Sequence, residues 1–253
     1  IIAVNKKSTM NMELQEVVSE IKKKENKKVV LTIYRDKKSK DYTVKKSSVQ
    51  LDTVSYKMKE KKIGYIAVSQ FLENTGDQFD KAVTALEKKG MKSLIIDLRD
   101  NGGGLLNTCT QMVSRVIDKD KLIVYTKDKE GNKEEFKSDS GKTLDIPIII
   151  LVNGNTASAS EIMTGCLKDY GKATVVGTTT YGKGIVQNIM PLTDGSAIKF
   201  TIAKYYTPNG TDIHKKGIKP DVKVKMSDAQ WKKAQTDEKA DKQLKKAIEL
   251  LEK

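Results

Sequence analysis

Apolar and polar residues alternate along the chain in blocks that predict strands and helices in turn. From about Val49 onward, short apolar runs typical of buried strands are separated by stretches with helical spacing. This alternation favours a sheet whose strands are joined by helical crossovers. The pattern predicts strands at 63–69, 93–98, 122–126 and 148–152, helices at 79–87, 105–117 and 161–169, and a charged hairpin around Gly131.

The apolar runs after residue 170 are not separated by long helices. They predict strands at 173–176, 185–190 and 197–206, for which we expect mixed or antiparallel pairing. Trp231 to Lys253 is predicted to be one polar helix, with Leu244, Ile248 and Leu251 as a modest apolar stripe. The fold class predicted for the chain is therefore mixed α/β (α+β).

The first fifth of the chain has a pattern of its own. Helical spacing over 12–21 places Leu14, Val17, Val18 and Ile21 on one face, and a strand is predicted at 29–34. We expect a small unit that precedes the larger domain.

Length and charge limit the classes of function. The 253 residues suffice for one sizeable domain and a smaller element, and no apolar run reaches the 18 residues of a membrane helix. The net charge of +14 comes from dispersed lysines, without aromatic residues interleaved as in a nucleic-acid surface. We expect a solvated lysine-rich surface and no nucleic-acid partner; attraction to an anionic membrane or cell-wall surface is the alternative.

Cysteine and histidine are too few for a metal-site pattern. Cys109 and Cys166 are the two cysteines and His214 is the single histidine. Their spacing matches no zinc motif, and whether the two cysteines pair does not follow from the sequence. We expect no metal and no organic cofactor.

Ser158 is the candidate nucleophile. It lies between the apolar run 146–152 and the helical stretch 161–169, so it should stand at a strand-to-helix junction. The free N–H groups and the dipole at a helix N-terminus would stabilise an oxyanion formed there. The alternative is that Ser158 only caps the helix.

A serine hydroxyl needs a base, and Lys183 is the candidate. A lysine amine has a pKa of about 10.4 in water, so it acts as a base near neutral pH only where burial or its neighbours keep it neutral. Lys183 lies between two glycines and beside the apolar pair Ile185-Val186, a setting that suits a neutral amine better than the charge runs that contain many of the other lysines. Gln187 could orient the amine without adding a charge.

Gly102, Gly103 and Gly104 follow an apolar strand and would expose backbone N–H groups. Such a loop could donate to an oxyanion, and the alternative is a tight turn that needs positive φ angles. A phosphate-binding loop is disfavoured, because the run lacks the Gly-Lys-Ser/Thr ending.

Together these motifs resemble the carboxyl-terminal processing peptidases, the Ser/Lys tail-specific protease family. The resemblance implies that Ser158 is the nucleophile, Lys183 the general base and Gln187 its support. It also implies an oxyanion hole formed by the N–H groups of Gly104, with help from Gly103, and of Ala159. The matching segments are Ile63-Gly64-Tyr65-Ile66 with Ser69 and Phe71, Asp97 to Gly104, Thr156 to Ile162, Tyr181 to Gly184, and Gly217 to Val222.

The resemblance also implies an architecture and a setting. We expect a crotonase/ClpP-like mixed-sheet serine protease core at 49–225, preceded by the C-terminal half of a PDZ domain at 1–48 and followed by a C-terminal helical segment at 226–253. The implied enzyme is a serine endopeptidase that cleaves polypeptides near exposed C-termini. We expect a homo-oligomer, exported to the extracytoplasmic face of a bacterial membrane or to the periplasm.

Three alternatives remain open at this stage. His214 could serve a Ser/His/Asp hydrolase, although its polar loop predicts a solvated side chain. A crotonase-like acyl-thioester enzyme would also use a glycine loop, but would give Lys183 no role. The core could also be a non-catalytic peptide-binding scaffold. Ser160 and Glu161 are expected to start the helix and to face its dipole.

Overall fold

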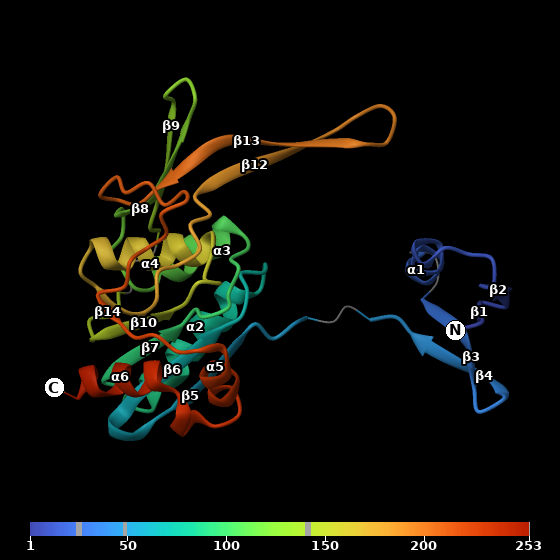
Figure 1. Cartoon of the computed structure of the whole chain (residues 1–253), viewed down its shortest axis with the longest axis horizontal. Helices are drawn as coiled ribbons and strands as arrows, with labels where there is room; N and C mark the ends of the chain where they lie inside the picture. Colours follow the sequence, from blue (N-terminus) through green and yellow to red (C-terminus); the bar gives the residue numbers. More distant parts are fainter. Residues whose placement is uncertain (24–26, 48–49, 140–142, 253) are drawn as a thin grey trace. The chain divides into compact units, whose positions relative to one another are not determined.

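The computed structural model describes residues 1–23, 27–47, 50–139 and 143–252. They form two compact units, Ile1–Leu51 and Asp52–Lys253, which are drawn together in Figure 1 and described separately below. The C-terminal segment belongs to the larger unit.

The smaller unit is a four-stranded antiparallel sheet, in the order β2-β1-β3-β4, with one short helix. Strands β3 and β4 form a hairpin whose turn residues Asp36 and Lys37 have φ of 51° and 60°, as a two-residue turn between twisted strands requires. That this unit is half of a PDZ domain stays a prediction. The elements are β1 (Ala3–Val4), β2 (Lys7–Ser8), α1 (Leu14–Lys22), β3 (Lys28–Arg35) and β4 (Lys38–Lys45).

The larger unit is built on a six-stranded sheet in the order β14-β11-β10-β7-β6-β5. Strand β5 runs antiparallel to β6, and the other neighbours are parallel. The mixed α/β fold predicted from the sequence is confirmed. The strands are β5 (Val54–Met58), β6 (Ile63–Val68), β7 (Ser93–Asp97), β10 (Ile148–Val152), β11 (Ala173–Gly177) and β14 (Val222–Lys223), and a short helix η1 (Glu60–Lys62) joins β5 to β6.

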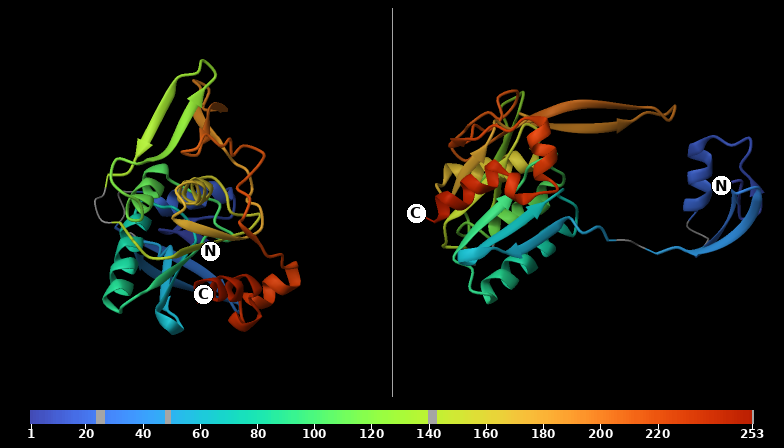
Figure 2. Two further views of the ribbon diagram at one scale, coloured as in Figure 1. Left: turned by 90° about the vertical axis from the view of Figure 1, so that its left-hand side faces the viewer. Right: turned by 60° about the horizontal axis from the view of Figure 1, so that its bottom comes forward.

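Helices cover both faces of this sheet, so successive strand residues enter opposite cores. On β10, Ile150 packs with the helices α2, α3 and α4, whereas Ile149 packs with Leu244 and Ala247 of the C-terminal helix α6. Figures 1 and 2 show α6 across the sheet from α3 and α4. The three helices of the first face are α2 (Thr75–Lys88), α3 (Leu106–Ser114) and α4 (Ala159–Asp169).

A second, antiparallel sheet has the order β12-β13-β8-β9, which agrees with the pairing expected for the later strands. Its hairpin of β12 and β13 extends away from the body of the larger unit (Figure 1). The strands are β8 (Leu122–Asp128), β9 (Lys133–Lys137), β12 (Ile185–Pro191) and β13 (Ala197–Tyr206).

The prediction of one continuous C-terminal helix is wrong. The segment forms α5 (Asp228–Ala234), η2 (Glu238–Ala240) and α6 (Lys242–Leu251), while Lys253 lies outside the described residues. The breaks arise because two aspartates act as N-caps: Asp237 accepts from Lys239 N, and Asp241 accepts from Leu244 N at 2.9 Å.

Candidate active site

Ser158 stands at the junction between β10 and α4, as its sequence position predicted. It is half-buried at the N-cap of α4, and its backbone has φ 58° and ψ −119°. That conformation is rare for a residue with a Cβ, and it is the kind of strained strand-to-helix turn that exposes a nucleophile. Neighbouring contacts hold the turn, since Ala157 N donates to Asn101 O at 3.0 Å and Thr156 Oγ1 donates to Leu98 O at 2.8 Å.

The glycine loop lies directly against this turn. A Cβ placed on Gly103 would stand 2.7 Å from Ala157 O, 2.8 Å from Ser158 Cβ and 2.9 Å from Ala159 N. Gly104, with φ 146°, would likewise drive a Cβ to 2.1 Å from Phe71 O. The loop therefore needs glycine at Gly103 and Gly104 for its backbone angles and for its close approach to Ser158 and Phe71, as the tight-turn interpretation requires, while the oxyanion role stays a prediction.

The predicted oxyanion donors differ in availability. Gly103 N donates to Asn101 Oδ1 at 2.8 Å, so this N–H is already used and cannot also hold an oxyanion in this arrangement. Within the described residues, the N–H groups of Gly104 and Ala159 have no hydrogen-bond acceptor. Ala159 directly follows Ser158, and Gly104 directly follows Gly103, the glycine that lies against Ser158 and Ala159. Both free N–H groups are candidates to donate to a developing oxyanion.

Glu161 joins the segment of Ser158 to the segment of Lys183. Its carboxylate is fully buried, and Oε2 accepts from Ser158 N at 2.9 Å and from Lys183 N at 2.8 Å. Oε1 accepts from Thr180 Oγ1 at 2.5 Å and from Gly182 N at 2.7 Å. A carboxylate has only acceptor sites, so it can satisfy these four donors at once.

This role of Glu161 was not predicted from the sequence, which indicated only a carboxylate placed for the helix dipole. The sequence signal was weak, because the polar row Ser160, Thr164 and Lys168 hides that the structure buries residues 159–167 all round. An acidic side chain in the first turn of a helix buried all round must find hydrogen-bond donors inside the protein.

Lys183 reaches the site through its backbone N–H, which donates to Glu161, whereas Gln187 lies further along β12; both residues are exposed. Lys183 is exposed between two buried glycines, so the burial that would favour a neutral amine is not present in this arrangement. Among the described residues, no hydrogen bond joins Lys183 Nζ to Ser158 Oγ or to Gln187. Gln187 lies at an irregularity of the β12–β13 ladder, one residue beyond Val186.

His214 is less exposed than its polar loop predicted. It is half-buried, and its Nδ1 is buried without a hydrogen-bond partner in the described structure. Its loop packs on the lysine segment: Lys215 N donates to Gly182 O at 2.8 Å, and a Cβ on Gly184 would stand 2.5 Å from His214 N. The carboxylate of Asp212 accepts from His214 N rather than from the ring, so the described residues contain no assembled Ser/His/Asp triad.

Neither a candidate metal cluster nor a membrane-spanning helix is found among the described residues. There, no group of three or more histidine, cysteine or acidic side chains is placed to hold a metal ion. Cys109 and Cys166 are free and buried, and burial raises the pKa of Cys109 to about 12. No described helix is both long enough and apolar enough to cross a bilayer.

Comparison with known proteins gives a consistent result. The model of peptidase family S41 matches residues 62–224. The chain is 43% identical over 226 residues to a probable CtpA-like serine protease of Staphylococcus aureus (strain N315), covering 88% of this chain and 45% of that protein. It is 41% identical over 229 residues to the carboxy-terminal processing protease CtpA of Bacillus subtilis (strain 168), covering 90% and 49%. The chain thus spans less than half the length of these relatives.

Among solved structures, the fold is similar to that of the photosystem II D1 C-terminal processing protease. The TM-score is 0.64 at 28% identity, over 88% of this chain and 62% of that one. The region matched by the family model contains the turn of Ser158, the glycine loop and the lysine segment, because all three lie inside residues 62–224.

Proposed function

The chain belongs to peptidase family S41, and on that premise we propose that it cleaves polypeptides by acyl transfer through Ser158. The observation that carries the proposal is the shared carboxylate of Glu161. One oxygen of Glu161 accepts from both Ser158 N and Lys183 N, so two segments 25 residues apart in sequence are neighbours in space. An arrangement of this kind is what a serine nucleophile with a lysine base requires.

The proposed reaction has two stages. Ser158 Oγ attacks the substrate carbonyl carbon while its proton passes to Lys183 Nζ, and the N–H groups of Gly104 and Ala159 hold the oxyanion. The carbon–nitrogen bond then breaks, and Lys183 returns the proton to the leaving amine. Water then attacks the acyl carbon while Lys183 takes its proton. The bond between that carbon and Ser158 Oγ breaks, and Lys183 returns the proton to Oγ.

The exposed position of Lys183 sets a condition on this mechanism. The side chain must rotate inward from its exposed position to meet Ser158 Oγ, with Gln187 as the group that orients the amine. Hydrogen bonds between catalytic groups are often long or unformed without substrate, so the proposal makes closure part of substrate binding. Because the Lys183 N–H donates to the buried carboxylate of Glu161, the backbone stays in place and only the side chain has to move.

The names of the relatives support a choice of substrate. Two of the similar proteins are described as C-terminal processing proteases. We propose that the substrates are polypeptides with exposed C-termini, that the protein works as a homo-oligomer on the extracytoplasmic side of a bacterial membrane, and that residues 1–48 select substrate tails as part of a PDZ domain.

The test is cleavage of an unstructured protein with an apolar C-terminus, followed across pH. Ser158→Ala and Lys183→Ala should lower the rate by about 10⁴-fold or more, while His214→Ala should retain activity. Lys119→Ala, at an exposed lysine outside the site, is the matched control and should behave as wild type. The wild-type rate should rise with pH, because only an uncharged amine can accept the serine proton. Cleavage that survives in Ser158→Ala, or that depends on His214, would overturn the proposal.

A further inference from the structure

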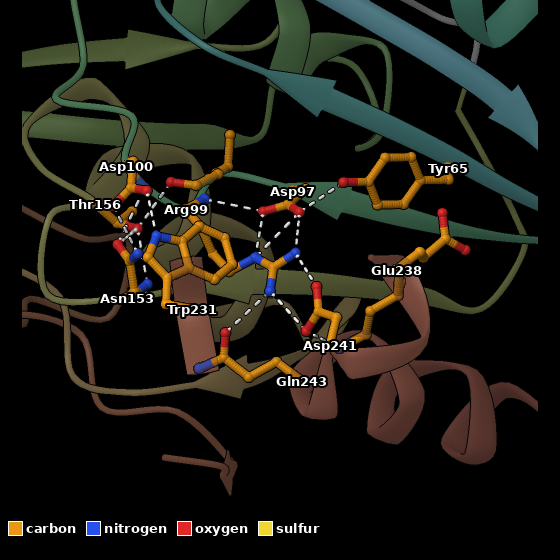
Figure 3. A network of polar contacts seen from close by, with 12 residues as sticks. Tyr65, Asp97, Arg99, Asp100, Asn153, Thr156, Trp231, Glu238, Asp241 and Gln243 are labelled. Carbon is orange, nitrogen blue, oxygen red and sulfur yellow. Dashed lines mark hydrogen bonds and ion pairs between the residues drawn. The ribbon is translucent and has the colours of Figure 1, made fainter. Parts of the chain in front are cut away.

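Arg99 is the centre of a buried polar network that joins the main sheet to the C-terminal segment (Figure 3). Its side chain is 4% exposed, between Asp97 at the end of β7 and Asp241 at the start of α6, which are 8% and 5% exposed. Arg99 Nε donates to Asp97 Oδ1 at 2.9 Å, and Arg99 Nη1 donates to Asp241 Oδ1 at 3.0 Å. Gln243 adds a further acceptor at 3.1 Å from Nη1. One cation is therefore matched by two carboxylates and an amide oxygen in a setting from which water is largely excluded.

Trp231 lies over this cation. Its ring stacks on the guanidinium of Arg99, 4.5 Å from carbon to ring centroid, and its Nε1 donates to Asp100 Oδ2 at 2.9 Å. Trp231 is on α5, so a residue of the C-terminal segment contacts the residue that directly precedes the glycine-loop sequence at 101–104. Stacking on an arginine fixes the ring plane, and with it the direction of the N–H.

Asp100 needs this kind of support. Its φ is 57°, in the left-handed region that is unfavourable for residues other than glycine and, to a smaller degree, asparagine and aspartate. Besides Trp231, its carboxylate accepts from Asn153 Nδ2 and from Asn155 Nδ2, each at 2.8 Å. Asp100 N in turn donates to Asn153 Oδ1 at 3.1 Å. The strained residue thus holds together the loop after β7 and the loop after β10.

Asn101, the residue after Asp100, contacts both the glycine loop and the turn of Ser158. Asn101 Oδ1 accepts from Gly103 N at 2.8 Å, and Asn101 O accepts from Ala157 N at 3.0 Å and from Ser160 Oγ at 3.0 Å. The orientation of the Asp100 backbone therefore fixes Asn101, which fixes both the glycine loop and the turn that holds Ser158.

We propose that Trp231 is a positioning residue for the reaction, acting through Asp100 on the loop that supplies the oxyanion donor Gly104. The proposal rests on the function proposed above. The C-terminal segment then both packs on the sheet and positions the loop. The two roles can be separated, because contacts other than those of Trp231 hold the segment on the sheet. Leu244 and Ala247 are buried against the sheet, and Glu238 forms ion pairs with Lys57 and Lys59. Losing the indole N–H should disturb the loop while the segment stays docked.

The test uses substitutions that remove one contact at a time. Trp231→Phe keeps an aromatic ring over Arg99 but has no N–H for Asp100, and Asp100→Asn keeps the size of the side chain but presents an amide nitrogen to neighbouring donors. Lys232→Ala, at an exposed position of the same helix, and Glu238→Gln, at the other anchor of the segment, are the controls.

The readouts are kcat and KM on the unstructured substrate, the rate at which a fluorophosphonate acylates Ser158, and the urea midpoint. Trp231→Phe should lower kcat and the acylation rate by about 5- to 10-fold, with KM within about twofold of wild type. The double variant Trp231→Phe/Asp100→Asn should be no slower than Asp100→Asn alone, because both act through one contact. The two controls should keep the wild-type kcat.

The outcomes separate the two proposals. If wild-type protein cleaves through Ser158 and Trp231→Phe keeps its kcat and acylation rate, Trp231 is only structural and the positioning proposal falls alone. The positioning proposal also falls if the effects of Trp231→Phe and Asp100→Asn multiply in the double variant. If the wild type shows no cleavage that depends on Ser158, the proposed function fails and the positioning role fails with it.

Discussion

Glu161→Gln tests the hydrogen-bonding centre of the site with almost no change of volume. All four groups around the carboxylate are donors: Ser158 N, Thr180 Oγ1, Gly182 N and Lys183 N. A glutamine side chain has one acceptor oxygen and one NH₂ group. In either orientation, its NH₂ faces two donors that then have no acceptor.

The size of the loss follows from that count. Thr180 cannot simply turn away, because its hydroxyl oxygen also accepts from Ile218 N at 2.7 Å. A hydrogen bond to a charged group contributes about 1.5–3 kcal/mol, so two lost bonds destabilise the unit by about 3–6 kcal/mol. Domains of this kind have a free energy of unfolding of about 5–15 kcal/mol. The variant should therefore still be folded at 25 °C, with a much smaller free energy of unfolding than the wild type. A turn displaced by about 1 Å should also lower kcat/KM by about 10²-fold.

The assay pairs urea unfolding, followed by circular dichroism, with kcat/KM on the unstructured substrate. Glu60→Gln is the control, since Glu60 is exposed and its loss should change the free energy of unfolding by less than about 0.5 kcal/mol. If Glu161→Gln unfolds within about 1 kcal/mol of wild type and cleaves at the same rate, the four contacts do not hold the site as argued.

Two further predictions concern the glycine loop and the thiols. Gly103→Ala should lower kcat/KM by about 10²-fold and cost about 1–3 kcal/mol of stability, because φ is 96° and the new methyl would meet Ala157 O at 2.7 Å. Gly102→Ala, at a position with open space around it, should match wild type in activity and urea midpoint. If the Gly102→Ala and Gly103→Ala variants lost equal activity and stability, the steric argument would be refuted. Burial raises the pKa of Cys109 to about 12 and also raises that of Cys166, so iodoacetamide at pH 8 should modify both only after denaturation, as read by intact mass. Rapid labelling of the native protein would contradict the buried, protonated thiols.

The elements that the sequence predicted well are those whose pattern is set by burial. Every residue of β7 and β10 is buried because helices cover both faces of the sheet, which leaves an apolar run through all of β10 and through the centre of β7. Ser158 was placed correctly because a strand and a helix flank it. Strand β4 gave no such signal, since every one of its residues is exposed. The C-terminal segment was predicted as one helix instead of several, because helical spacing in a polar sequence does not reveal that Asp241 caps a new helix.

The missed parts of the site depend on contacts between distant segments. Arg99 and Asp241 are 142 residues apart, and nothing near either residue in the sequence indicates the other. The donors around Glu161 come partly from a loop about 20 residues further along the chain. Local patterns report on burial and capping, whereas the partner of a buried charge is decided by the tertiary fold.

The backbone angles of Ser158 have an evolutionary consequence. At φ 58° and ψ −119°, glycine would be the relaxed residue, and any side chain costs about 1–3 kcal/mol. Selection for stability of the fold therefore favours glycine at position 158, whereas selection for catalysis favours serine. A lineage that no longer needed the reaction would gain stability from the change of serine to glycine. A serine retained at this position in spite of its cost in stability indicates that its hydroxyl is still used. A glycine at the same position of a related sequence would indicate a protein that has lost the catalytic activity.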